Sequence, residues 1–258
     1  MEDQKQILKA VFGESSSDTE DENERSDFIH THGEKNPSWE RVKEIDGLWL
    51  CSDFLSPERQ SSLLSSIQRE GWFTEASHNQ AMRFGDLPEW AMELSGFIRE
   101  AVFCSEFFSE LCEETIPKQD DAEACPLASD LLWREPLFDQ LIVNVYQPGE
   151  GICGHVDLMR FDDGIAIISL ESACVMHFTR VEREAHGDEN GEEEKEGSLT
   201  RKVPVFLSPG SLVLMSGEAR YLWKHEINRK RGFQVWEGQE IHQLRRTSVT
   251  LRKLCQPK

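Results

Sequence analysis

The stretch LIVNVYQPGEGICGHVD, residues 141–157, decides the fold. It is an apolar, β-branched run that is broken by Pro148-Gly149 and ends in His-x-Asp. Short apolar runs bounded by Gly, Pro and Ser predict strands rather than helices. Further runs of this kind follow at 164–170 (GIAIISL), 173–181 (ACVMHFTRV), 203–208 (VPVFLS), 211–216 (SLVLMS), 221–227 (YLWKHEI) and 248–254 (SVTLRKL). The second half of the chain is therefore predicted to be a β sandwich or jelly roll.

Upstream of this β-rich half, the sequence favours helices. A predicted strand at Leu48–Cys51 leads into a helix that Ser56 caps and Pro57 begins, and Gly71 ends this helix. A second predicted helix follows Pro88 and covers 89–111. We therefore expect an α+β fold, with N-terminal helices packed on a double-stranded β-helix (jelly-roll) core.

The charge is unevenly distributed. The chain has 258 residues and a formal net charge of −20. Residues 1–40 carry eleven acids against four bases, a net −7, and residues 182–197 carry eight acids against two bases, a net −6. We expect a disordered acidic tail at 1–38, a folded domain at 39–258 and an exposed acidic insertion loop at 182–200. By contrast, residues 220–258 carry ten bases against three acids, a net +7, so the overall sign does not exclude a nucleic-acid partner.

The start of the tail contains one apolar motif. Ile7, Leu8, Val11 and Phe12 have helix-like spacing and are followed by Gly13 and acids. This pattern is typical of a frayed terminal helix, and the alternative is a short motif that folds in the groove of a partner. On the second interpretation, the motif around Phe12 would bind a transcription-associated protein.

Several classes of protein are excluded or disfavoured. The N-terminus shows neither a secretory signal nor a transit peptide, and no apolar run is long enough for a membrane span. The seven cysteines are scattered, with no Cys-x-x-Cys spacing, which favours reduced thiols. We expect a monomer without membrane association in the nucleus, the cytoplasm or both.

Five polar residues form a pattern that points to iron chemistry. His155 and Asp157 follow one β run and His225 lies in another, which is the two-His, one-carboxylate set of non-haem Fe(II) sites. Such a site leaves positions open for a chelating 2-oxoacid and O2. Arg246 and Arg252 lie an even six residues apart, so they share one face of a strand and can meet a carboxylate. His177 and His242 are the competing candidates for the third ligand.

Four segments together resemble the AlkB family of Fe(II) and 2-oxoglutarate dependent dioxygenases: HNQAMRFGDLPEWAMEL (78–94), NVYQPGEGICGHVD (144–157), GEARYLWKHEI (217–227) and RRTSVTLRK (245–253). The resemblance implies that His155, Asp157 and His225 hold iron. It also implies a 2-oxoglutarate site with O2 as cosubstrate, made of Asn144, Tyr146, Arg246, Ser248 and Arg252. Within the family the chain is nearest to the eukaryotic tRNA-hydroxylating branch, and we expect it to lack the extra domains of that branch.

The resemblance implies oxidative demethylation or hydroxylation of a nucleic acid, with RNA or tRNA favoured over DNA. Candidate substrate contacts are Met82, Arg83, Phe84 and Tyr221, because a base taken out of its stack needs aromatic and cationic neighbours. The first three of these could equally be core residues. Two other functions stay open. One is a demethylase or hydroxylase acting on protein, which the acidic surface would suit, and the other is a non-catalytic adaptor recruited through the N-terminal motif.

Overall fold

The computed structural model describes residues 38–75, 77–105, 125–181, 202–228, 230 and 232–256. All of them belong to one compact unit, Lys35–Lys258. The predicted acidic tail apart from Ser38, its motif around Phe12 and the predicted insertion loop 182–200 lie outside the described residues. Among the described residues, no helix is long and apolar enough to cross a membrane.

The described helices are α2 (Pro57–Arg69), α3 (Glu89–Phe103), α5 (Ser129–Leu132) and α6 (Gly217–Tyr221). The strands are β1 (Trp39–Arg41), β2 (Leu48–Cys51), β3 (Gln80–Phe84), β4 (Gln140–Tyr146), β5 (Ile152–His155), β6 (Ile165–Leu170), β7 (Cys174–Arg180), β8 (Lys202–Leu207), β9 (Leu212–Met215), β10 (Trp223–Ile227), β11 (Val235–Trp236), β12 (Gln239–Glu240) and β13 (Arg246–Arg252). Each β run predicted from the sequence overlaps one of these strands.

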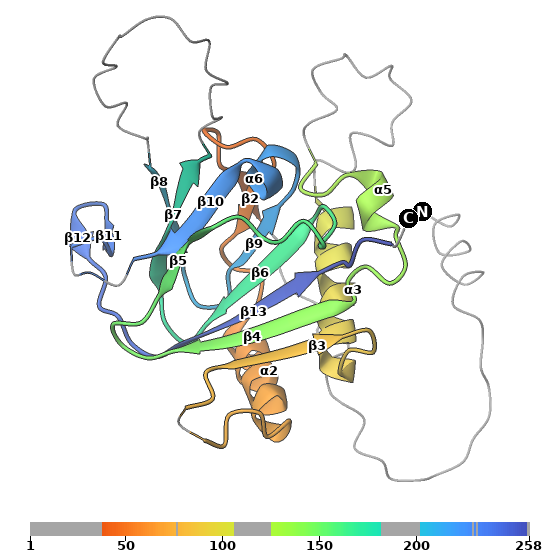
Figure 1. Ribbon diagram of the computed structural model, residues 1–258, viewed down its shortest axis with the longest axis horizontal. Coiled ribbons are helices and arrows are strands. Elements are labelled where there is room, and N and C mark those ends of the chain that lie inside the picture. The colour runs from red at the N-terminus through yellow and green to blue at the C-terminus, as the bar shows by residue number, and fades with distance from the viewer. Residues whose placement is uncertain are drawn as a thin grey trace, which may run out of the picture. The chain divides into compact units, whose positions relative to one another are not determined.

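The strands form two main antiparallel sheets (Figure 1). The larger sheet has the order β1-β2-β9-β6-β13-β4-β3, and the smaller has the order β5-β10-β7-β8. The chain passes from β4 in the larger sheet to β5 in the smaller one and back to β6, and it repeats such crossings from β8 to β9 and from β9 to β10. This winding between two sheets is consistent with the predicted jelly-roll core.

Helices α2 and α3 pack on the outer face of the larger sheet (Figure 1). Ser56 accepts a hydrogen bond from the backbone N–H of Arg59 at 3.4 Å, which caps α2, and Leu63 and Ile67 are buried. In α3, residues such as Leu94 and Ile98 join the same apolar cluster.

The second predicted helix, 89–111, corresponds to α3 over its first part. Helix α3 ends at Phe103, where the Ser105 hydroxyl and backbone N–H both donate to the carbonyl of Val102 and form a turn. Residues 106–111 of the prediction lie outside the described residues.

The inner face of the larger sheet meets the smaller sheet in a separate core. Ile165 and Ile167 of β6 pack there with Phe178 of β7 and Trp223 of β10. Since side chains alternate along a strand, the even-numbered residues of β4 and β13 point to this inner face, and the odd-numbered residues point to the helices. Register then places Arg246 opposite Tyr146 on the inner face.

The predicted strand 221–227 needed one correction. Residues 217–221 form the short helix α6, and β10 begins only at Trp223. Gly217 has a φ of 51°, a left-handed conformation that favours glycine, and its N–H is bonded to the carboxylate of Asp163. Tyr221 therefore ends a helix instead of starting a strand.

Candidate metal centre

Three side chains from the smaller sheet and its exit meet at one point. His155 ends β5, Asp157 follows it by two residues, and His225 lies within β10 directly opposite His155. One ligand atom from each residue lies within 4.8 Å of the others, and the two imidazole centroids are 4.4 Å apart. The competing candidates His177 and His242 are not part of this group.

The protonation and burial of the three groups suit a divalent metal. Burial lowers the pKa of His225 to about 4, so its ring is neutral at pH 7 and has a lone pair to offer. The Nδ1 atom of His155 lies 2.9 Å from the carbonyl of Cys153, and a proton there leaves Nε2 as the ligand atom. Asp157 Oδ2 is buried and has no hydrogen bond within the described part of the chain. A buried carboxylate oxygen of this kind calls for a cation, and the residues therefore fit Fe(II).

The other carboxylate oxygen of Asp157 is occupied by an arginine. Arg252 Nη2 lies 2.6 Å from Asp157 Oδ1, and Arg252 Nη1 donates to Gln140 Oε1 at 3.3 Å. The ring of Phe161 covers the same guanidinium at 4.8 Å. Asp157 is thus held in one orientation, with one oxygen neutralised and the other directed to His225 at 3.8 Å.

Arg246 is the cation best suited to the far carboxylate of 2-oxoglutarate. It is buried, its Nε donates to Ser169 Oγ at 3.0 Å, and its guanidinium lies 5.5 Å from the ring centroid of Tyr146. Its Nη2 is buried without a hydrogen bond among the described residues. A buried cation with an unpaired N–H donor favours binding of an anion, because a buried donor without a hydrogen bond costs free energy.

The remaining predicted 2-oxoglutarate contacts lie on the same inner face. Ser248 pairs with Asn144 across β13 and β4, and Asn144 accepts a hydrogen bond from Gln80 at 2.7 Å. Burial raises the pKa of Tyr146, so its hydroxyl keeps its proton and can donate. A pocket of about 250 Å³ is lined by Gln80, Asn144, Tyr146 and Ile152, among others, but not by Arg246 or the candidate metal ligands.

The predicted substrate contacts divide into two groups. Met82 and Phe84 pair with Ile142 and Gln140, so they share the inner face with the site, and both are exposed. Arg83 points to the opposite face of β3, where its guanidinium lies 4.5 Å from the ring centroid of Trp72. The structure thus brings Met82 and Phe84, but not Arg83, to the inner face, and it places Tyr221 against Arg220 at the end of α6.

The family model described as the 2OG-Fe(II) oxygenase superfamily matches residues 47–252, which include every candidate ligand. The chain is an AlkB-type 2OG-Fe(II) oxygenase. The expected dioxygenase activity and the expected use of Fe(II) and 2-oxoglutarate are thereby confirmed.

Two curated relatives and one solved structure agree with this assignment. The chain is 30% identical to "tRNA (carboxymethyluridine(34)-5-O)-methyltransferase alkbh8" of Xenopus tropicalis, over 83% of this chain and 33% of that protein. It is 28% identical to "Alkylated DNA repair protein ALKBH8 homolog" of Arabidopsis thaliana, over 81% of this chain and 59% of that protein. The chain thus spans between a third and three-fifths of the length of these relatives. The structure of OsALKBH1 matches with a TM-score of 0.54 at 15% identity, over 84% of this chain and all of that one, which shows the shared fold.

Sequence reasoning missed several residues of the AlkB-type site. Gln140 orients Arg252, Ser169 orients Arg246, and Phe161 covers Arg252. One signal was available: Ser169 and Gln140 are polar positions inside or beside apolar runs that become buried or largely buried strands. Buried polar groups need partners, and here the partners are the two site arginines.

Proposed function

We propose that this AlkB-type oxygenase oxidises a nucleic acid, with RNA, including tRNA, as the first candidate, by demethylation or hydroxylation. The observation that carries the proposal is a column of alternating rings and guanidinium groups that runs from the surface to the metal centre. Phe84 is exposed and lies 5.5 Å from Arg160; Arg160 lies 5.0 Å from Phe161; and Phe161 lies 4.8 Å from Arg252, which binds Asp157. A base can stack on the outer end of this column.

Exposed apolar side chains surround the outer end of the column. We call this group the rim: Met82, Phe84, Leu158, Met159 and Arg160. Its four apolar members are between 42 and 63% exposed, and Leu158 and Met159 directly follow Asp157 in the chain. Large apolar side chains exposed beside a reactive centre favour a ligand that stacks, and unpaired bases stack on aromatic rings and guanidinium planes.

The positive charge of residues 220–258 supports the proposal less than the sequence indicated. Arg220, Arg246 and Lys253 are buried, and Arg252 is paired with Asp157. These cations hold the site together and cannot contact a phosphate backbone. The names of the two relatives, one a tRNA methyltransferase and the other an alkylated-DNA repair protein, agree with a nucleic-acid substrate.

The residues divide the chemical work among them. Fe(II) and 2-oxoglutarate, when bound, supply with O2 the oxidising power that breaks a C–H bond of the substrate. His155, Asp157 and His225 would hold the metal, and Arg246 would fix the cosubstrate by its carboxylate. An N-methyl group hydroxylated in this site would leave as formaldehyde, whereas a carbon substituent would remain hydroxylated.

The test is a direct comparison of substrate pools. The purified protein is incubated with Fe(II), 2-oxoglutarate and ascorbate and with methylated RNA, methylated DNA or methylated histone peptides, and mass spectrometry follows loss of methyl or gain of oxygen. We expect turnover of the RNA pool. Turnover of the histone pool alone would overturn the proposal in favour of a protein-directed enzyme, and no turnover of any pool would favour the adaptor.

A variant pair tests the rim itself. Phe84→Ala should weaken binding of a single-stranded RNA oligonucleotide by about tenfold, since stacking of one base contributes ~1–3 kcal/mol. Phe103→Ala is the matched control, because Phe103 is similarly exposed, at 48%, but lies at the end of α3. Fluorescence anisotropy measures both. Equal affinities for wild type and Phe84→Ala would remove the rim from the substrate site.

A further inference from the structure

The carboxylate ligand lies on a loop rather than on a strand. Residues 156–164 connect β5 to β6, and their only ladder contact among the described residues is the isolated bridge between Phe161 and Leu254. A metal ligand must be held to within about 0.5 Å of its working position, which an unsupported loop does not achieve. Some other group must therefore hold this loop in place.

Arg220 is the group that holds the loop at the ligand. Its side chain is 1% exposed, and it donates hydrogen bonds to three backbone carbonyls: Asp157 at 3.0 Å, Leu158 at 2.9 Å and Phe161 at 3.0 Å. One of these carbonyls belongs to the metal ligand itself. The planar guanidinium fixes the relative directions of its donors, so the three carbonyls are fixed relative to one another as well.

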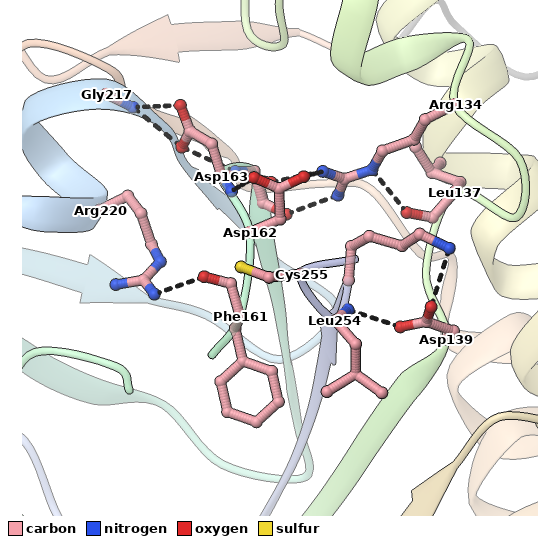
Figure 2. Close-up of polar contacts among 12 residues, drawn as sticks. Arg134, Leu137, Asp139, Phe161, Asp162, Asp163, Gly217, Arg220, Leu254 and Cys255 are labelled. Atoms are coloured by element: carbon pink, nitrogen blue, oxygen red, sulfur yellow. Dashed lines mark hydrogen bonds and ion pairs between the residues drawn. The ribbon is translucent and has the colours of Figure 1, made fainter. Parts of the chain in front are cut away.

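The position of Arg220 in the chain links two ligand segments. Arg220 lies in α6, five residues before His225, and α6 leads into β10 after a single residue. A second contact joins the same two segments, because Asp163 in the loop accepts the backbone N–H of Gly217 at the start of α6, at 3.0 and 3.1 Å (Figure 2). A shift of Arg220 would therefore move Asp157 relative to His225.

Stability alone gives little reason for an arginine here. A buried guanidinium loses its hydration, and neutral carbonyls return only part of that cost. Moreover, the Nε of Arg220 has no hydrogen bond among the described residues. An apolar side chain of similar volume would avoid the buried charge but would leave the three carbonyls without this donor, so the fork of donors is the property that this position uses.

We propose that Arg220 is a positioning residue that sets the geometry of the metal centre by holding the backbone of Asp157 in register with the strand that carries His225. This inference rests on the family's iron chemistry and is independent of which substrate is oxidised. It predicts that replacing the guanidinium of Arg220 lowers the affinity for the metal even where the fold is kept.

The chain offers a matched control at the far end of the same loop. Arg134 also donates to three backbone carbonyls, those of Leu137, Asp163 and Gly164, at 2.9, 2.6 and 3.1 Å (Figure 2). It therefore supports the loop from residues 163 and 164 but does not contact the backbone of Asp157. Arg134→Lys disturbs two hydrogen bonds to this loop and Arg220→Lys disturbs three, and only the second variant acts at the ligand.

The experiment measures metal binding without turnover. Isothermal titration with Mn(II) gives the affinity, and anaerobic absorption spectra of the Fe(II) and 2-oxoglutarate complex report the ligand field. Arg220→Lys should weaken Mn(II) binding by about tenfold to 100-fold, the range found when partners of metal ligands are removed, and should shift the spectrum. Arg134→Lys should stay within about twofold of wild type in affinity, because the carboxylate keeps its support.

Thermal unfolding separates positioning from general stability. We expect similar losses of melting temperature in the two lysine variants, with the loss of metal affinity confined to Arg220→Lys. Wild-type Mn(II) affinity and an unchanged spectrum in Arg220→Lys would overturn the proposal. An equal loss of affinity in Arg134→Lys would overturn it as well, since the effect would then follow loop stability. Lysine is chosen rather than methionine because Arg220→Lys keeps the charge and most of the volume of the side chain. Its metal affinity can therefore be measured even where Arg220→Met does not fold.

Discussion

Replacing Arg246 with methionine tests the cosubstrate site most directly. The guanidinium is buried, its Nε is committed to Ser169, and its Nη2 has no hydrogen bond among the described residues. One or two donors are therefore available to a carboxylate. A hydrogen bond to a charged group contributes ~1.5–3 kcal/mol, so Arg246→Met should raise the KM for 2-oxoglutarate by roughly tenfold to 150-fold.

The same substitution should have little effect on the unliganded fold. It removes the bond to Ser169, worth ~1 kcal/mol, but it also removes a buried charge that has no carboxylate partner among the described residues. We expect the free energy of unfolding to change by no more than about 1 kcal/mol, as measured by urea denaturation. The loss should appear in ligand binding, where 2-oxoglutarate should no longer raise the melting temperature.

The assay is succinate release as a function of 2-oxoglutarate concentration, without a second substrate. Arg245→Met is the matched control. Arg245 is the preceding residue, its side chain is 50% exposed, and it pairs with Glu171 away from the site. An exposed ion pair contributes less than ~1 kcal/mol to stability, and the KM should stay within about twofold of wild type. The reasoning is refuted if Arg246→Met keeps the wild-type KM or if both variants raise it equally.

Three further predictions concern the metal centre and the fold. Asp157→Ala should abolish Mn(II) binding and substrate-independent 2-oxoglutarate turnover, and it should destabilise the fold by ~3–5 kcal/mol, because Arg252 is left buried without its counter-ion. Titration calorimetry tests the metal binding, and urea denaturation tests the stability. Retained turnover would contradict the iron assignment. Gly47→Ala should lower the free energy of unfolding by at least ~2 kcal/mol, since Gly47 has a φ of 79° and a Cβ there would lie 2.0 Å from the Ser216 carbonyl oxygen. Gly96→Ala, in α3 with nothing within 4 Å of the added Cβ, should raise the free energy of unfolding by ~0.5–1 kcal/mol. The same sign for both changes would be evidence against the backbone argument. Phe178→Ala should cost ~3–5 kcal/mol in chemical denaturation because the ring is fully buried, and a cost under ~1 kcal/mol would show that the core between the sheets closes the cavity.

The sequence was sufficient to predict most of the strands and to name the candidate metal ligands that the fold brings together. Apolar runs between turn residues predicted the strands, because a strand buried on both faces consists mostly of apolar side chains. His155, Asp157 and His225 could be named because few residue types bind Fe(II), and their order matched a known family. The start of β10 was misplaced, since the short helix α6 precedes it and a contact distant in sequence, the hydrogen bond from the Gly217 N–H to Asp163, lies at the start of that helix.

The sequence by itself thus determined the sheet-forming segments, the chemistry of the ligands and the family. Only the tertiary structure decided how each charge is used. Residues 220–258 are basic as a sequence, but Arg220, Arg246 and Lys253 are buried, and Arg220 serves backbone carbonyls of a loop that is about sixty residues away in the chain. The reason is physical. The partner of a buried polar group is set by strand register and loop path, and both depend on contacts between segments that are distant in the sequence.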